Sequence, residues 1–113
     1  MIILKYDPYT GIVMPEGRVS QYVKETLAEY HNDDNNINNQ YAITFGQSLI
    51  LTYFRIAVKE DRLDSSDIII TMKDGVNIPI NPDGSISYWP DGLCDYQITA
   101  TTRLLGRKNR DVQ

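Results

Sequence analysis

Three side chains of this sequence are the most able to take part in catalysis or metal binding: a carboxylate, an imidazole and a thiol. Asp7 follows a short apolar run and precedes Pro8. A carboxylate at the end of a strand can hold a cation or polarise a water molecule, but Asp before Pro is also typical of turns, where its side chain bonds to the nearby backbone. We therefore interpret Asp7 as a turn residue and keep a catalytic role as the alternative.

His31 and Cys94 are the single histidine and the single cysteine of the chain. One residue of each kind cannot build a His-rich metal site or an internal disulfide, so we expect no metal and no cofactor, and a reducing compartment. His31 follows a predicted helix, where a protonated imidazole interacts favourably with the helix dipole, which indicates a capping role. For Cys94, which has no partner His in a recognisable constellation, we expect a buried, inert thiol.

Aromatic side chains are the second chemical feature, with eight tyrosines in 113 residues. Exposed tyrosines supply contact area at a low cost in conformational entropy, so a face that bears them predicts an interface. A lone Trp beside a turn is more typical of a side chain that covers the edge of the core, although it can extend such a surface. The interface candidates are Tyr22, Tyr30, Tyr53, Tyr88 and Trp89.

Length and charge limit what surrounds these side chains. With 113 residues and 42% hydrophobic content the chain can close one core, and we predict one domain over residues 1–105 with a mobile tail over 106–113. The net charge of −4 argues against binding to nucleic acid or anionic membranes. No apolar stretch approaches the roughly 20 residues of a membrane span, and the N-terminus has no targeting pattern, so we expect a cytoplasmic protein without a membrane partner.

The first half of the chain predicts alternating strands and helices. Residues 2–6 form a short apolar run that predicts a buried strand, and apolar residues at helical spacing over about 17–30 predict an amphipathic helix. The Asn- and Asp-rich residues 31–39 indicate a surface loop. Residues 41–45 then predict a second strand, and 47–60 predict a helix that is apolar on most of its surface and therefore buried on more than one side.

The second half predicts a hairpin. Residues 67–72 and 76–80 are apolar runs joined by a turn that contains Asp-Gly, a strong hairpin signal, and Pro79 places the returning strand at an edge. We also expect a short strand over 85–88 and a last helix over 93–105. The predicted fold class is α/β, a largely parallel β-α-β-α-β core extended by an antiparallel β-hairpin.

Several segments of this sequence support a resemblance to a known family. They are ITFGQS at 43–48, FRIAVK at 54–59, SDIII at 66–70, INPDGSI at 80–86 and WPDG at 89–92. From residue 41 to about 96 the chain resembles the C-terminal part of the ATPase domain in stand-alone, RecF/SMC-like ABC-type ATPases of prokaryotic defence systems, including overcoming-lysogenization-defect-like systems. The resemblance implies half of an ABC-type ATPase domain.

The resemblance also implies a degraded active site. The family's switch histidine, which senses the nucleotide γ-phosphate, falls on Gly46, and the acidic pair that ends the Walker B strand falls on Tyr6 and Asp7. Glycine cannot donate a side-chain hydrogen bond and tyrosine is a poor Mg²⁺ ligand, so Asp7 is at most a vestigial catalytic residue. The sequence also has no Gly-x-x-x-x-Gly-Lys-Ser/Thr loop for phosphate. We therefore expect no ATPase activity from this chain alone.

These observations predict a non-catalytic protein-binding module. As a degenerate ATPase fragment, the chain would act as a decoy, inhibitor or accessory of an intact ATPase of a defence system, in the manner of a phage-encoded inhibitor, or it would form a homodimer. A sheet cut from a larger domain has exposed edges, and exposed edges pair with other chains. Two alternatives stay open: the Walker B half of a split ATPase that a second chain completes, and an unrelated small α/β binding module.

Overall fold

The computed structural model describes residues 1–32 and 40–94. They form a mixed, mostly parallel sheet with two helices, which confirms the predicted α/β class and the predicted order of elements from the first strand to the hairpin. The elements are β1 (Ile2–Tyr6), α1 (Glu16–Asn32), β2 (Tyr41–Phe45), α2 (Ser48–Lys59), a 3₁₀ turn (Ser65–Asp67), β3 (Ile68–Thr71) and β4 (Asn77–Pro79). Neither helix is long and apolar enough to cross a bilayer, within the residues described.

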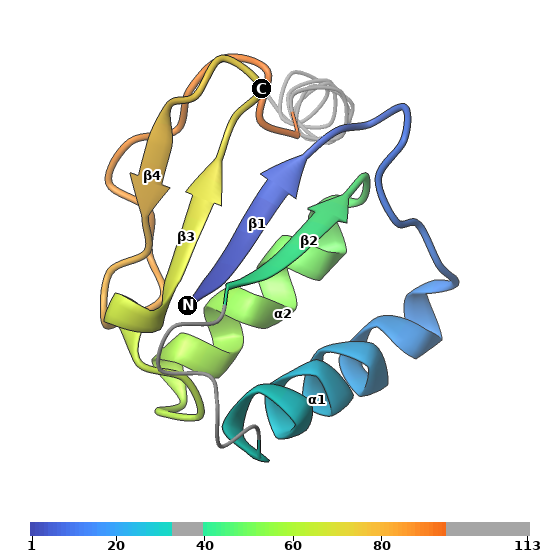
Figure 1. Ribbon diagram of the computed structural model, residues 1–113, viewed down its shortest axis with the longest axis vertical. Helices are drawn as coiled ribbons and strands as arrows, with labels where there is room; N and C mark the ends of the chain where they lie inside the picture. The colour runs from blue at the N-terminus through green and yellow to red at the C-terminus, as the bar shows by residue number, and fades with distance from the viewer. Residues whose placement is uncertain (33–39, 95–113) are drawn as a thin grey trace, which may run out of the picture.

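Strand β1 is the centre of the sheet. The strand order is β2-β1-β3-β4, with β1 parallel to both neighbours and β4 antiparallel to β3 (Figure 1). The predicted hairpin joins β3 to β4, and Gly75 adopts a φ of 90°, a conformation that glycine reaches without a steric penalty. The amide of Met72 donates to the carbonyl of Val76 at 2.9 Å and closes this turn.

One face of the sheet is buried beneath the helices. Side chains alternate between the two faces of a strand, so Ile2, Leu4 and Tyr6 of β1 point to the same side, and all three are buried in the core. Figure 1 shows α2 across the back of the sheet, with α1 lying beside α2. We call this the helix face and the opposite side the open face.

The burial of the two helices agrees with their sequence patterns. In α1 the buried residues form one stripe, made of Val19, Val23, Leu27 and Tyr30. Helix α2 packs against both the sheet and α1, and within its bounds only Thr52 and Lys59 are exposed, as its composition predicts. His31 lies in the last turn of α1, where its Nε2 is 2.8 Å from the carbonyl oxygen of Arg62. The imidazole therefore lies at the terminus of α1, as expected, and it also connects the end of α1 to the loop after α2.

The expected strand over residues 85–88 is wrong. The Asn81 side-chain amide donates to the hydroxyls of Ser85 at 3.0 Å and Ser87 at 2.7 Å, while the Asp83 carboxylate accepts the amide N–H of Ser85 at 2.9 Å. Such local side-chain bonds compete with a strand ladder and hold this segment as a turn. Of the expected helix over 93–105, Leu93 and Cys94 lie in a bend, and the rest of it, like the expected tail over 106–113, lies outside the described residues.

The C-terminal described segment is attached to α2 through Arg55. Its guanidinium Nε donates to the carbonyl of Gly84 at 2.8 Å, and its guanidinium carbon lies 5.8 Å from the centre of the Trp89 ring. The indole N–H of Trp89 in turn donates to the carbonyl of Leu93 at 2.8 Å. Trp89 therefore helps to hold the end of the described chain against α2, as expected for a Trp that covers the edge of a core.

Residues 11–14 cover the carboxyl end of the outer edge of β2. The amide of Ile12 donates to the carbonyl of Thr44 at 2.8 Å, and the amide of Gly46 donates to the carbonyl of Ile12 at 2.9 Å. The side-chain amide of Gln47 then bonds to both backbone groups of Met14, at 3.1 Å and 3.0 Å. This short segment satisfies edge groups that would otherwise be open to another chain.

The other edge of the sheet is β4, which contains Pro79 as the sequence predicts. The bond between Met72 and Val76 sets the alternation of the ladder, so the backbone of Pro79, opposite Ile69, points away from β3. Proline has no N–H to offer a further strand there. The expectation that open edges of the sheet recruit a partner stays a prediction, for one edge that is covered at the carboxyl end of β2 and another that Pro79 blunts at β4.

Gly11 makes the covering segment possible, and its replacement tests the fold. A Cβ at residue 11 would overlap the backbone of Phe45 and Gly46, whereas a Cβ at Gly17, in the first turn of α1, would meet nothing within 4 Å. We expect Gly11→Ala to lower the free energy of unfolding by about 3 kcal/mol, because backbone atoms cannot yield as a flexible side chain can. The matched variant Gly17→Ala should raise it by about 0.5 kcal/mol. Urea unfolding followed by circular dichroism measures both, and equal effects would contradict this account.

Candidate functional site

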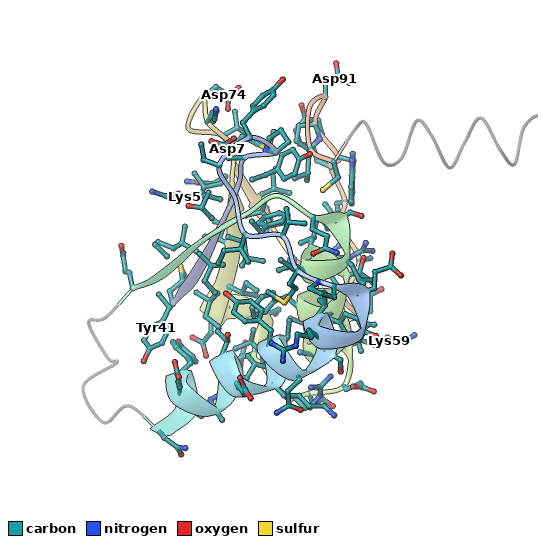
Figure 2. All side chains as sticks on the ribbon, turned by 90° about the vertical axis from the view of Figure 1, so that its right-hand side faces the viewer. Lys5, Asp7, Tyr41, Lys59, Asp74 and Asp91 are labelled. Carbon is teal, nitrogen blue, oxygen red and sulfur yellow. The ribbon has the colours of Figure 1, made fainter. Side chains whose placement is uncertain are left out.

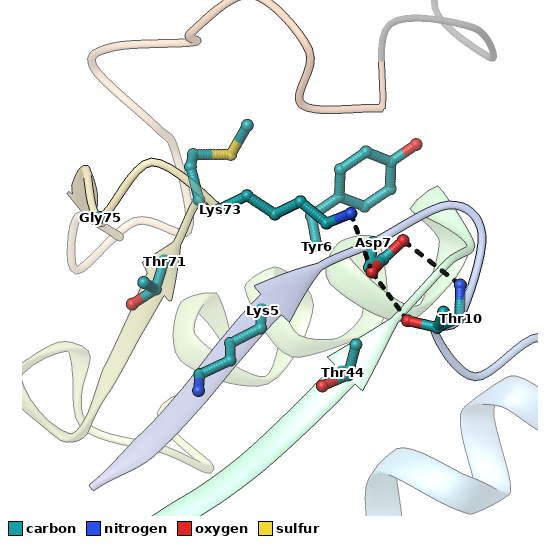
Figure 3. A pocket seen from close by; sticks show the side chains of 9 residues that line it. Lys5, Tyr6, Asp7, Thr10, Thr44, Thr71, Lys73 and Gly75 are labelled. Atoms are coloured by element: carbon teal, nitrogen blue, oxygen red, sulfur yellow. Dashed lines mark hydrogen bonds and ion pairs between the residues drawn. The ribbon is translucent and has the colours of Figure 1, made fainter.

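The candidate site lies at the carboxyl ends of β1 and β3. After β1 the chain passes to the outer edge of β2, whereas after β3 it turns the other way into β4 (Figure 1). Diverging connections of this kind open a crevice at the carboxyl edge of an α/β sheet, where ligands commonly bind. A cavity of about 400 Å³ lies there, and we call it the carboxyl-edge cleft (Figure 3). Its polar lining is Lys5, Asp7, Thr10, Thr44, Thr71 and Lys73.

Asp7 is held in place by four donors. Its Oδ1 accepts the amide N–H of Tyr9 at 2.9 Å and that of Thr10 at 3.2 Å. Its Oδ2 accepts the hydroxyl of Thr10 at 2.7 Å and lies 3.2 Å from the Nζ of Lys73. This is the turn chemistry predicted for Asp7. The carboxylate closes the loop after β1 and pairs with a cation from the β3–β4 hairpin.

The same donors determine the charge of Asp7. The Thr10 hydroxyl and the Tyr9 amide hold the pKa of the Asp7 carboxyl far below its usual range. Burial opposes them with a smaller effect, and the ammonium of Lys73 adds a further lowering that is smaller still. Asp7 is therefore ionised at neutral pH. Two carboxylate oxygens offer about four acceptor positions, and four donors already occupy them, so Asp7 has little capacity left for a metal ion or a water molecule.

A polar row crosses the open face beside the cleft. The register aligns Thr44 of β2, Lys5 of β1, Thr71 of β3 and Asn77 of β4, and we call these four residues the polar row. The Thr71 hydroxyl donates to Oδ1 of Asn77 at 2.9 Å. Figure 3 shows Lys5 projecting between Thr44 and Thr71. The Lys5 side chain is exposed and makes no hydrogen bond or ion pair with residues 1–32 or 40–94.

An apolar row runs parallel to the polar row, two residues earlier along β1. It consists of Ala42, Ile3, Ile69 and Pro79, one residue from each strand. The two isoleucines are half-buried, and Ala42 and Pro79 are exposed. No helix or strand of the described chain lies over this row, since both helices pack on the other side of the sheet. Figure 2 shows the two sides, with Lys5 on the opposite side of the molecule from Lys59 of α2.

The predicted aromatic interface residues do not gather on one exposed surface. Tyr30 is 5% exposed and packs edge-on against Tyr41, with ring centres 5.3 Å apart, so it has almost no surface to offer a partner. Tyr22 and Tyr53 are half-buried against the core. Only Tyr88, at 62% exposed, and Trp89, at 37% exposed, present substantial area. Tyr22, Tyr30 and Tyr53 lie on the core side of their helices because of their spacing along the helix. The number of tyrosines in the sequence does not reveal this placement.

The residues singled out by the ATPase resemblance have local structural roles. Tyr6 is 7% exposed, and its ring packs against that of Phe45 with centres 5.3 Å apart. A Cβ at Gly46 would lie 3.1 Å from the carbonyl oxygen of Asp7 and 3.2 Å from that of Gly11, so larger residues would crowd the loop after β1. The Cys94 thiol is fully buried, as expected. No group of three or more His, Cys, Asp or Glu side chains that could hold a metal lies within residues 1–32 and 40–94.

The residues of the candidate site that the sequence analysis missed are Lys5 and Lys73. A signal for Lys5 exists: it is the single charged residue in an apolar strand, at a position that alternates with buried Leu4 and Tyr6. Lys73 follows β3 and approaches Asp7 only because β1 and β3 are neighbours.

Comparisons with known proteins found no matching family model, curated protein or solved structure. The family resemblance therefore stays a prediction.

Replacing Asp7 tests the charge assignment. A carboxylate whose pKa is depressed on folding stabilises the fold above its unfolded pKa of about 3.9, and that stabilisation is lost as the pH falls through the folded pKa. We expect Asp7→Asn to be less stable than the parent at pH 7, with a difference that shrinks steadily between about pH 4 and pH 2. Urea unfolding at several pH values measures this. A difference that is independent of pH would show that Asp7 acts through shape alone.

Proposed function

We propose that this chain is a protein-binding module without chemistry of its own, and that its partner docks on the open face of the sheet. The observation that supports the proposal is the apolar row, which extends across all four strands and is covered by no described helix or strand. Sheets with mainly parallel strands usually have both faces covered, because crossover helices pack on each side. A partner would supply the missing cover here.

The energetics favour the face over the edges. Residues 11–14 bond to the carboxyl end of the outer edge of β2, and Pro79 blunts β4, so each edge offers a partner fewer free backbone groups than a full open strand would. Ile3 and Ile69 keep part of their surface exposed, and burying the rest of each side chain would contribute on the order of 1 kcal/mol at about 25 cal/mol per Å². Polar residues on one side of the apolar row would orient a partner.

The partner that we propose is an intact ATPase of the resembled family, with a second copy of this chain as the other outcome of the test. Strand β1 is central and parallel to both neighbours, as half of an ABC-type domain requires. Because Asp7 is occupied by loop-closing hydrogen bonds, the chain would act as a decoy, inhibitor or accessory. A phage or defence-system origin and a cytoplasmic location belong to this proposal, and the buried Cys94 thiol is compatible with a reducing compartment.

One observation favours the split ATPase as a second candidate. Asp7 lies at the carboxyl end of the central strand, where the resemblance places a catalytic carboxylate. For that role Asp7 would have to exchange the Thr10 hydroxyl and Lys73 for Mg²⁺. Isothermal titration of MgATP into this chain, alone and with a candidate second chain, separates the two functions. Binding that requires both chains and Mg²⁺ would support the split enzyme.

Substitution of Ile69 tests docking on the open face. Ile69→Glu places a charge in the apolar row, and Val76→Glu places the same charge on an exposed valine of the neighbouring hairpin. We expect Ile69→Glu to weaken binding at least about 10-fold, which corresponds to about 1.4 kcal/mol, and Val76→Glu to change it less than about twofold.

The measurement is biolayer interferometry against a purified RecF/SMC-like ATPase of the host, together with sedimentation equilibrium of this chain alone. Thermal unfolding checks that both variants fold. If the parent chain stays monomeric and binds neither the ATPase nor any other host protein, the proposal fails. Equal loss of binding in both variants would place the interface away from the apolar row.

A further inference from the structure

We infer that the carboxyl-edge cleft binds a small dianionic oxyanion, a phosphate group, without the help of a metal ion. Phosphate binding is independent of docking on the apolar row, because it depends on the lysines and threonines at the carboxyl edge. Nothing in the family resemblance assigns a ligand to these residues. The charge, the hydrogen-bond donors and the volume of the cleft all favour such a ligand.

The charge of the cleft favours an anion. The chain has a net charge of −4, so anions are repelled from most of its surface. The cleft is different, since it contains two lysines and one aspartate. The Asp7 carboxylate lies 3.2 Å from the ammonium of Lys73, which leaves the charge of Lys5 uncompensated by described residues. The lining therefore has a local net charge of +1.

The hydrogen-bonding groups of the cleft also favour an anion. Lys5 offers three N–H donors, Lys73 has donors beyond the one that faces Asp7, and Thr44 adds a hydroxyl. The single carboxylate of the lining is Asp7, and its oxygens already accept four donors. A lining rich in donors and poor in free acceptors suits an oxyanion and disfavours a cation.

The type of donor favours phosphate over a carboxylate. A carboxylate is best recognised by the planar fork of an arginine, and the polar lining of the cleft contains lysines and threonines instead. Ammonium groups act as compact point charges, and they can contact a tetrahedral anion from different directions. Lys5 comes from β1 and Lys73 from the hairpin after β3, and these two strands are neighbours in the sheet.

The volume of the cleft allows a ligand larger than a phosphate ion. A cavity of about 400 Å³ is larger than a phosphate ion needs and lies in the range of small-molecule sites. The apolar row begins two residues before Lys5, which is about 7 Å along the strand at about 3.3 Å per residue. A phosphate monoester with a small apolar body can therefore place its phosphate beside Lys5 and its body over Ile3 and Ile69.

The test is a ¹H–¹⁵N NMR titration with inorganic phosphate at constant ionic strength in the presence of EDTA. We expect saturable shifts in the amide signals of the residues that line the cleft, which are Lys5, Thr44, Thr71, Lys73 and Gly75. Lys5→Gln should weaken the affinity at least about 10-fold, because it removes the uncompensated charge. Lys5→Arg should restore most of the affinity. The matched control is Lys24→Gln, which removes the same charge from the exposed side of α1.

The other outcomes overturn the inference. Shifts that do not saturate, or equal losses in Lys5→Gln and Lys24→Gln, would mean that phosphate acts on the overall charge of the protein. A requirement for Mg²⁺ would assign the phosphate to a metal site instead. Phenyl phosphate tests the monoester: tighter binding than inorganic phosphate, with shifts in the methyl signals of Ile3 and Ile69, supports it. Equal binding without methyl shifts overturns the placement of an apolar body on that row.

Discussion

The structure depends on a close crossing of backbone between the loop after β1 and the end of β2. The amide of Asp7 donates to the carbonyl of Phe45 at 2.9 Å, and the amide of Gly11 donates to the carbonyl of Asp7 at 2.8 Å. Two glycines, Gly11 and Gly46, allow this approach because neither has a Cβ to keep the chains apart. The crossing fixes the Asp7 carboxylate, aligns residues 11–14 with the edge of β2, and directs the chain away from β3. Both the covered carboxyl end of the β2 edge and the cleft follow from it.

Much of the fold could be predicted because the hydrophobic periodicity was unambiguous. The apolar run of β1, the stripe of α1 and the Asp-Gly turn of the hairpin each have a local cause that the sequence shows directly. The segment over 85–88 was harder to predict, because the Asn81 side chain bonds to Ser85 and Ser87. The alternating residues of this segment therefore form no strand of the sheet. Local side-chain chemistry overrode a weak strand pattern.

The candidate site was less accessible from sequence, for a geometric reason. Lys73 is far from Asp7 along the chain, and only the parallel register of β1 and β3 brings the two together. The two rows on the open face likewise depend on register, since a slip by one residue would exchange the faces of a strand. Asp7 itself was identified, and so was its turn role, because that chemistry acts over three residues.

The central position of β1 has a consequence for how the polypeptide is made. Strand β1 is the first to be synthesised and pairs on both sides, with β2 and with β3. A nascent chain that has completed β1, α1 and β2 still exposes one side of β1 until residues 68–71 leave the ribosome. Unpaired strand edges are where incomplete chains aggregate. Translation speed between β2 and β3 therefore sets how long that vulnerable intermediate persists.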